Sequence, residues 1–519
     1  MVKEVVSRLN NNNILWTSLI IILFVYFLYP IIDITKFVGD KNSAAVTGIS
    51  SDSALILHMI TETTPWQENI FVWGNGRSGS IIFLISKIIY LLASPEFTLR
   101  FVNFLLTLVI VLGMSVPIFF KNNKPIFAPI GVLFFISALK TLQAPSREML
   151  MLVTADLVHR PEFIFTLNGA ILLSVYNFLN NKKYILPLLL CTIASAWLNY
   201  LSIPLLFVLF AVLTLINTTN LANKNSHKIA LKNFELWPWA VLTITILATL
   251  ALVHLSAHQP TNMFKFATFD MIKTNFAKGV LNLYQIFPIQ LWILMLILNI
   301  GFLAAYLKHA RHDKTYHNRF YFSYWLCLSA LAVVSFVLPF GSEWFYGNLA
   351  LPRYTVTALH LLILATSVSV VGLLNVVVKN KGDKRMLLLP LLIILIIIGT
   401  TFWQYRSERV TAPQSPQFIS GQTLSKNCDG VVGDYWNSYV YGLGGFGKLK
   451  TGSYGFDRSR VNLEHVLSLN NLCVVESQAQ NFKSNYTILN KTLRPSNNTQ
   501  NATQLPDGNY YKHYTTSVQ

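Results

Sequence analysis

One carboxylate near the start of the chain has the chemistry of a general base. Asp52 follows the stretch GISS and precedes ALILHMI, so it stands where the N-cap residue of an amphipathic helix would stand. An ionised carboxylate can accept the proton of an attacking nucleophile, which makes Asp52 a candidate catalytic base. The local sequence also fits a purely structural cap, so the role of Asp52 depends on what surrounds it.

Several basic residues from separate segments could oppose this carboxylate. Arginine and lysine at a lipid–water boundary bind the phosphate groups that lie at that depth. Each of these residues alone also fits an interfacial anchor, but their grouping with a carboxylate suits chemistry on a phosphorylated lipid. The residues expected to bind the phosphate are Arg77, Arg160, Lys265 and Arg353.

Two further segments carry residues that could contact a sugar or an acceptor. In HRPE at 159–162, Pro161 suits the first turn of a helix and Glu162 its N-terminus, which is a sufficient structural account. Charged residues beside a membrane segment are costly, however, and are therefore functional candidates. The aromatic residues of 341–355 fit an interfacial belt, and their faces can also stack on sugar rings. The residues expected to contact sugar or acceptor are Asp156, His159, Glu162, Trp344 and Tyr346.

Other reaction chemistries lack their motifs in this sequence. No glycine-rich loop follows the pattern that cradles nucleotide phosphates. His58, His254 and His258 do not show the close spacing with a third ligand that zinc requires. The sequence therefore predicts neither a nucleotide cofactor nor a dedicated metal site, and it leaves the help of a divalent metal open.

The composition indicates that a membrane must hold these residues. Hydrophobic residues make up 53% of the 519 residues and charged residues 12%. A soluble chain carries about 25% charged residues, so a soluble enzyme and a disordered chain are both excluded. The net charge of +18 does not indicate nucleic-acid binding, because a membrane protein places lysine and arginine on its cytoplasmic side. Membrane lipids are the expected surroundings.

The sequence contains eleven candidate membrane spans, since a helix needs roughly 20 mostly apolar residues to cross the hydrocarbon layer. The apolar run at 184–217 is interpreted as two short helices broken at Asn199 and Pro204. The run at 80–93 is too short to cross and is interpreted as an interfacial helix within a long outer loop, 33–98. The predicted spans are 14–32, 99–120, 126–142, 162–179, 184–198, 200–217, 236–256, 289–307, 320–340, 354–378 and 386–403.

Charge and composition also divide the chain and orient it. The loops predicted to lie on the same side of the membrane as the N-terminus, such as KNKGDKR at 379–385, carry an excess of basic residues. This excess predicts a protein of the inner membrane whose N-terminus is cytoplasmic. Residues 1–403 form the predicted transmembrane domain. Residues 404–519 are polar, with strand-like runs such as GVVGDYW, and predict a small extracytoplasmic α/β domain. Cys428 and Cys473 lie beside two such runs in an oxidising compartment, so we expect a disulfide.

Together these features resemble the GT-C superfamily of membrane glycosyltransferases, which includes the protein O-mannosyltransferases and the aminoarabinose transferases. The resemblance rests on Asp52 opening ALILHMI, on WGNGRSGS, SIIFLISKIIYLL and LRFVNFLL after it, and on LPRYT and GDYWNSY late in the chain. The family usually has an acidic pair where this chain has Asp52 and Ser53. The prolines common in the family's turn are replaced here by Ser78 and Gly79.

The resemblance implies a polytopic α-helical membrane protein with a small outer domain. It implies transfer of a sugar from a polyprenyl-phosphate donor to a lipid, glycan or protein acceptor on the outer face, with inversion at the anomeric carbon. Asp52 would act as general base. Arg353, with Arg160 or Lys265, would bind the leaving phosphate, and Arg77 would organise the first outer loop.

Two other classes of protein fit a similar membrane topology. An O-antigen-type polymerase or ligase would carry its key arginine and histidine in a long loop late in the membrane region, whereas the long loop here, 33–98, comes first. A non-enzymatic lipid or glycan transporter usually shows repeat symmetry and charged residues at mid-membrane, whereas most charges here lie at the edges of the apolar runs. A transfer assay with polyprenyl-phosphate sugars tests the glycosyltransferase interpretation.

Overall fold

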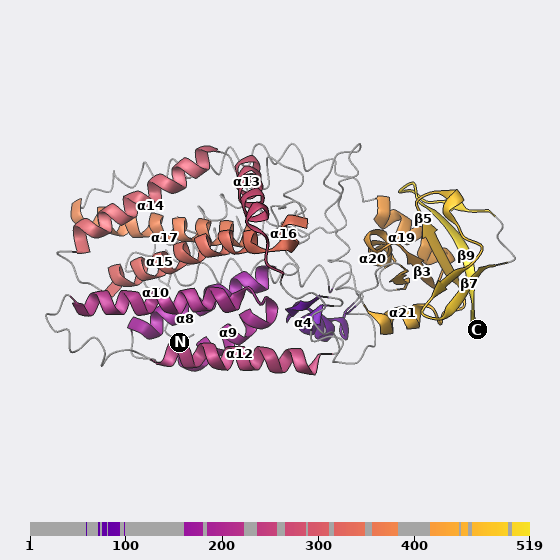
Figure 1. The fold of residues 1–519 in the computed structure, drawn as a ribbon, viewed down its shortest axis with the longest axis horizontal. Helices are drawn as coiled ribbons and strands as arrows, with labels where there is room; N and C mark the ends of the chain where they lie inside the picture. Colours follow the sequence, from indigo (N-terminus) through magenta and orange to yellow (C-terminus); the bar gives the residue numbers. More distant parts are fainter. Residues whose placement is uncertain are drawn as a thin grey trace.

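A bundle of helices and a smaller sheet-containing region lie one after the other along the longest axis of the molecule (Figure 1). The helices of the bundle run along this axis, and the sheet-containing region stands beyond one of their ends. The structure is a computed structural model. It describes residues 59, 71–72, 75–79, 81–93, 98, 160–179, 184–222, 236–256, 265–286, 289–310, 316–347, 355–381, 416–445, 448–454, 459–496 and 501–518.

The long helices of the bundle each coincide with a predicted span. Four of them contain segments long and apolar enough to cross a membrane: Trp237–Leu255, Ile289–Lys308, Arg319–Gly341 and Thr357–Leu374. The three that come first in the chain contain shorter apolar segments. The predicted spans 14–32, 99–120, 126–142 and 386–403 lie outside the described residues. The bundle helices are α8 (Arg160–Leu179), α9 (Ile185–Leu198), α10 (Ser202–Ala222), α12 (Trp237–Leu255), α14 (Ile289–Ala310), α15 (Tyr316–Val337) and α17 (Val356–Lys381).

A small polar cluster ties three of these helices together. The Asn299 side chain on α14 accepts hydrogen bonds at Oδ1 from Trp325 Nε1 (2.6 Å) and from Ser369 Oγ (2.9 Å). Its Nδ2 donates to Thr366 Oγ1 over 2.9 Å. Trp325 lies on α15, and the two hydroxyl residues lie on α17. Hydrogen bonds between helices are a main source of specificity where the hydrophobic effect does not distinguish partners.

Several short elements gather at the end of the bundle that faces the sheet-containing region (Figure 1). Helix α4 has ten residues, which at 1.5 Å per residue is about 15 Å, as short as the sequence indicated. Helix α13 is a difference from the sequence-based expectation, because no helix is predicted between the spans 236–256 and 289–307. These elements are β1 (Phe71–Val72), β2 (Asn75–Gly79), α4 (Ile81–Tyr90), α13 (Phe269–Ile286), η4 (Leu338–Gly341) and α16 (Glu343–Gly347).

The C-terminal region is a mixed sheet with helices on both faces. Its strands follow the order β4-β3-β5-β9-β7-β6, with β8 paired to β9. Strand β3 runs parallel to β4 and β5, and the other pairs are antiparallel. The elements are α19 (Pro416–Asn427), β3 (Gly430–Gly433), α20 (Tyr435–Gly444), β4 (Lys450–Ser453), α21 (Arg460–Val466), β5 (Leu472–Glu476), η7 (Ala479–Asn481), β6 (Tyr486–Ile488), β7 (Lys491–Pro495), β8 (Thr503–Gln504) and β9 (Tyr510–Val518).

Successive residues of β3 point to opposite faces of this sheet and build two cores. Val431 packs in a cluster with Leu424 of α19 and Tyr441 of α20. Val432 packs in a second cluster with residues of α21 such as Leu463. The side-chain period of two along a strand therefore accounts for the helices on both faces.

Candidate functional site

Two segments with predicted site residues lie side by side at the end of the bundle. The backbone N–H of Glu343 donates to the carbonyl of Lys265 over 3.0 Å, and that of Ala267 donates to the carbonyl of Gly341 over 2.9 Å. Phe266 and Ser342 form an antiparallel bridge between these bonds. The structure therefore places Lys265, a predicted phosphate ligand, beside α16, which carries the predicted sugar contacts Trp344 and Tyr346.

Helix α13 packs against this pairing. The buried Asn275 side chain donates from Nδ2 to the carbonyls of Phe340 (2.9 Å) and Ser342 (3.4 Å). A Cβ atom on Gly279 would lie 2.6 Å from Phe340 Cε1, so only glycine lets α13 approach this closely. Phe340 and Phe345 are both buried and pack against each other. The 265–267 strap, α16 and α13 thus form one packed unit.

The polar groups of this unit are open to binding. The Lys265 side chain is exposed, and the Tyr346 ring is 40% exposed. An exposed ammonium group binds a phosphate as a point charge, and an exposed ring offers a face to a sugar. A cation and an aromatic face on two paired segments are groups that can bind the phosphate and the ring of a sugar phosphate.

Three other predicted site residues fall on described backbone. Arg160 begins α8 and Glu162 lies in its first turn, so the expected helix start at HRPE is confirmed. Arg77 lies in β2. The predicted residues Asp52, Asp156, His159 and Arg353 lie outside the described residues, so the structure does not show whether they join Lys265.

The described strands of the first loop rest against the bundle. Phe71 of β1 is fully buried, and its ring meets the ring of Tyr200, at the turn between α9 and α10, edge to face with centroids 6.1 Å apart. Strand β2, which contains Arg77, pairs with β1. Part of the predicted loop 33–98 is therefore fixed at the same end of the bundle as Lys265 and α16 (Figure 1).

Sequence reasoning missed Asn275 and the helix that carries it. The signal was available in the apolar residues Phe269, Ile272, Phe276 and Val280, which recur every three or four positions in a segment of mixed polarity. That period predicts an amphipathic helix. The role of Asn275 carries no such signal, because it depends on two carbonyl groups from a distant segment.

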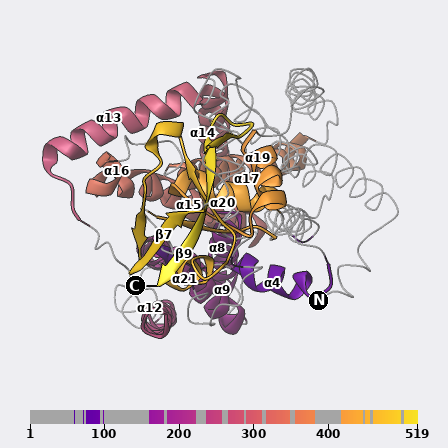
Figure 2. The same ribbon diagram turned by 90° about the vertical axis from the view of Figure 1, so that its right-hand side faces the viewer.

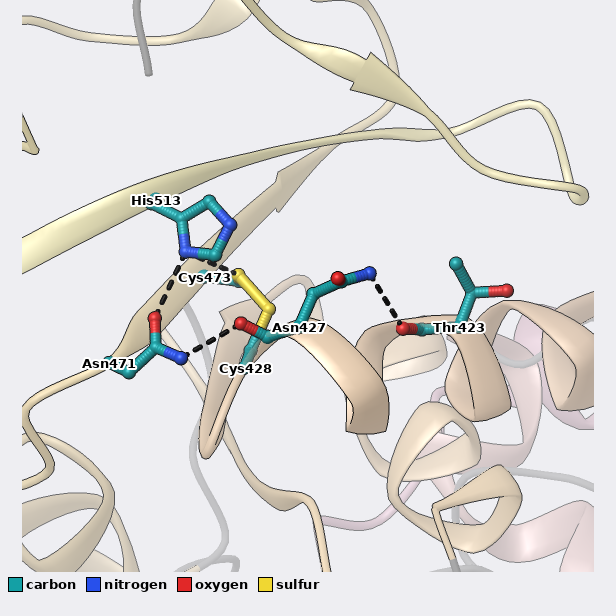
Figure 3. The surroundings of a disulfide bond; sticks show 6 residues. All are labelled: Thr423, Asn427, Cys428, Asn471, Cys473 and His513. Carbon is teal, nitrogen blue, oxygen red and sulfur yellow. Dashed lines mark hydrogen bonds between the residues drawn. A yellow bond between two sulfur atoms is a disulfide. The ribbon is translucent and has the colours of Figure 1, made fainter. Parts of the chain in front are cut away.

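Cys428 and Cys473 form the expected disulfide, with Cα atoms 5.9 Å apart (Figure 3). With His513 they are the one group of potential metal ligands found among the described residues. Sulfur atoms joined in a disulfide are not thiolates and do not bind a metal ion as thiolate ligands, so the disulfide gives this group a structural role. His513 lies opposite Cys473 in the β5–β9 register, with its Nδ1 3.6 Å from Cys473 Sγ.

The protonation of His513 follows from its neighbours. Asn471 Nδ2 donates to the Asn427 carbonyl over 2.8 Å, which leaves Asn471 Oδ1 as an acceptor. His513 Nδ1 lies 3.0 Å from that oxygen and therefore carries the proton (Figure 3). Burial lowers the pKa of His513 below its ordinary value, so the imidazole is neutral near pH 7.

The fold is that of a known membrane glycosyltransferase. The crystal structure of ArnT from Cupriavidus metallidurans bound to undecaprenyl phosphate matches 96% of this chain and 98% of its own chain, with a TM-score of 0.54 and 11% sequence identity. No protein-family model and no curated protein matches the sequence. ArnT is a GT-C aminoarabinose transferase. The chain therefore has a GT-C-like fold, as the resemblance in its motifs indicated, and four of its described helices are long and apolar enough to cross a membrane.

Proposed function

We propose that this protein transfers a sugar from a polyprenyl-phosphate donor to an acceptor at the outer face of the membrane, with inversion. The observation that carries the proposal is the similarity over 96% of the chain to a transferase whose structure holds undecaprenyl phosphate. The packed unit of Lys265, α16 and α13 supports it, because its paired segments carry an exposed lysine and an exposed aromatic ring, which suit a sugar phosphate. The donor bond already supplies the activation, so no nucleotide is needed.

In this proposal the general base lies near the start of the sequence, and the residues that bind the phosphate come from later segments. Asp52 accepts the proton of the acceptor hydroxyl or amine as that atom attacks the anomeric carbon. Arg353, with Arg160 or Lys265, binds the leaving phosphate as its negative charge develops, which is where fixed cations lower a barrier most. Arg77 orders the first loop. The expected sugar and acceptor contacts are Asp156, His159, Glu162, Trp344 and Tyr346.

A transfer assay with the reconstituted protein and radiolabelled polyprenyl-phosphate sugars tests the proposal. Loss of a general base lowers rates by about 10²–10⁴, so we expect a fall of that size in kcat for Asp52→Asn. Arg353→Ala should lower the rate of the same step. Lys448→Ala is the matched control, because Lys448 is an exposed lysine of the C-terminal region. Turnover equal to that of the unsubstituted protein in all variants would exclude the mechanism, and the same assay with a chelator tests for a divalent metal.

Lys265 allows a sharper test, because its backbone bonds to the α16 segment do not depend on its side chain. Hydrogen bonds to charged groups contribute about 1.5–3 kcal/mol, so Lys265→Ala should lower kcat/KM by about ten- to hundredfold. We expect a fall in kcat, because the charge on the phosphate grows in the transition state, and a rise in the KM for the donor to the extent that Lys265 also binds the intact donor phosphate. Rates measured over a range of donor concentrations separate the two, and an unchanged kcat/KM would show that Lys265 does not bind the phosphate.

A further inference from the structure

Helix α13 crosses the end of the bundle instead of running along it (Figure 1). It comes between α12 and α14, both of which contain candidate membrane spans. A helix that connects two spans consecutive in the chain, at the same end of the bundle, lies at the level where the hydrocarbon layer ends. The view along the bundle shows that α13 reaches the edge of the molecule, beyond α16 (Figure 2).

The contacts of α13 with the rest of the protein fix its rotation about its own axis. Asn275 and Gly279, one turn apart, are buried and face the η4 segment. Each further residue turns the helix by about 100°, so every other position has a defined direction. The helix therefore cannot turn its apolar side inward without breaking these contacts.

An apolar stripe of exposed side chains lies beside this anchored face, and of its residues Phe276 also packs edge to face on Phe340, with ring centroids 5.6 Å apart. The stripe consists of Phe269 (76% exposed), Ile272 (37%), Phe276 (52%) and Val280 (42%). These positions are three, seven and eleven residues apart, so they share one side of the helix. Two phenylalanines and two branched residues on one side form the apolar face of a helix that lies in a membrane interface.

The charges of α13 complement a phosphate-bearing surface. Lys273 borders the apolar stripe, and Lys278 lies on the opposite side of the helix; both are exposed. Asp270 is the single acidic residue in the helix sequence, and the exposed Lys265 lies four residues before the helix begins. A lysine at the border of an apolar face attracts the anionic phosphates of lipid headgroups.

We infer that α13 is an interfacial helix whose apolar stripe inserts between the headgroups and acyl chains of the leaflet at this end of the bundle. Lys273, at the border of the stripe, then contacts lipid phosphates, and Lys278 faces water. The flanking spans also expose apolar residues at the ends that lead into and out of α13, such as Leu255 on α12 and Ile289 on α14. Through the 265–267 strap, the bilayer would also hold Lys265 at headgroup level. This inference does not depend on the proposed reaction.

Spin labels on opposite sides of α13 test the inference in the full chain. With Cys191→Ala and Cys327→Ala as background, single labels are placed at Phe276→Cys and at Lys278→Cys, and the protein is reconstituted in phosphatidylcholine vesicles with phosphatidylglycerol. We expect a several-fold higher ratio of oxygen to aqueous nickel-chelate collisions at position 276 than at 278. Phe269→Cys, on the same stripe and away from Phe340, repeats the measurement if Phe276→Cys disturbs the packing.

Changes in lipid composition and interactions between labels supply the results that would support or overturn the inference. Removing the phosphatidylglycerol should lower the ratio at 276, and Lys273→Gln should weaken that response. Equal ratios at 276 and 278 in both lipid mixtures would overturn the inference. Dipolar broadening between labels at 276 would also overturn it, because that signal would show a second copy of the chain covering the stripe.

Discussion

His513 is a residue whose protonation depends on the packing of the C-terminal region. Burial lowers the pKa of its imidazole, so near pH 6 the folded protein binds fewer protons at this site than the unfolded chain does. The free energy of unfolding therefore falls as pH drops through the ordinary histidine value of about 6.5, and the fall ends below the folded-state pKa.

The pH dependence can be measured on the whole protein. We expect the urea midpoint for loss of protease resistance in 416–518 to be lower near pH ~5 than near pH ~7. His513→Gln should lose part of this difference. His465→Gln should keep it, because His465 is an exposed histidine of the same region. Identical pH profiles for the unsubstituted protein and His513→Gln would show that another group titrates.

For single residues, the sequence indicated which side chains belong to the candidate site better than it indicated which groups they contact. Lys265, Trp344 and Tyr346 were assigned to one site because their segments follow apolar runs on the same predicted side, and the structure joins those segments by backbone hydrogen bonds. Asn275 was missed because its two carbonyl partners belong to a segment distant in the sequence. The packing of distant segments is not encoded in local spacing.

At the scale of elements, one glycine sets the distance between two bundle helices. A Cβ atom on Gly372 of α17 would lie 2.2 Å from Cε2 of the buried Phe302 ring of α14. Overpacking of a filled core costs about 1–3 kcal/mol, so we expect Gly372→Ala to lower the unfolding free energy by that amount. Thermal unfolding of the protein in detergent, followed by circular dichroism, measures the change.

Gly301 supplies the matched control for this prediction. It lies on α14, and a Cβ atom there would lie 3.8 Å from Leu373 Cδ1, an ordinary contact. Gly301→Ala should therefore leave the melting temperature unchanged or raise it, since alanine is favoured over glycine in a helix by up to about 1 kcal/mol. Equal losses in both variants would show that helix flexibility, and not the Phe302 contact, explains the effect.

A helix could be predicted from the sequence where the length and hydropathy of its own segment indicate it. Length and hydropathy indicated α12, α14, α15 and α17 within a few residues of their observed bounds. Helix α13 was not recognised, because polar residues between those of the apolar stripe lower its mean hydropathy. Which helix faces which also could not be predicted, since contacts such as Gly372 with Phe302 depend on side chains from both partners.

For the whole molecule, the short elements and the C-terminal region lie at the same end of the bundle (Figure 1). The predicted site residues Lys265 and Tyr346 lie at that end, and Lys308 lies near the opposite end of α14. The change of composition after residue 403 indicated a separate polar region, because a polar sequence cannot face lipid. Its position next to the site segments required the structure.

The side of the membrane on which this end lies is the remaining prediction at the scale of the molecule. The excess of basic residues predicts that Lys308 is cytoplasmic and that Lys448, in the C-terminal region, is outside. In the background of Cys191→Ala and Cys327→Ala, a membrane-impermeant maleimide should label Lys448→Cys in intact spheroplasts. It should label Lys308→Cys only after permeabilisation. The reverse pattern would place Lys265 in the cytoplasm and contradict transfer at the outer face.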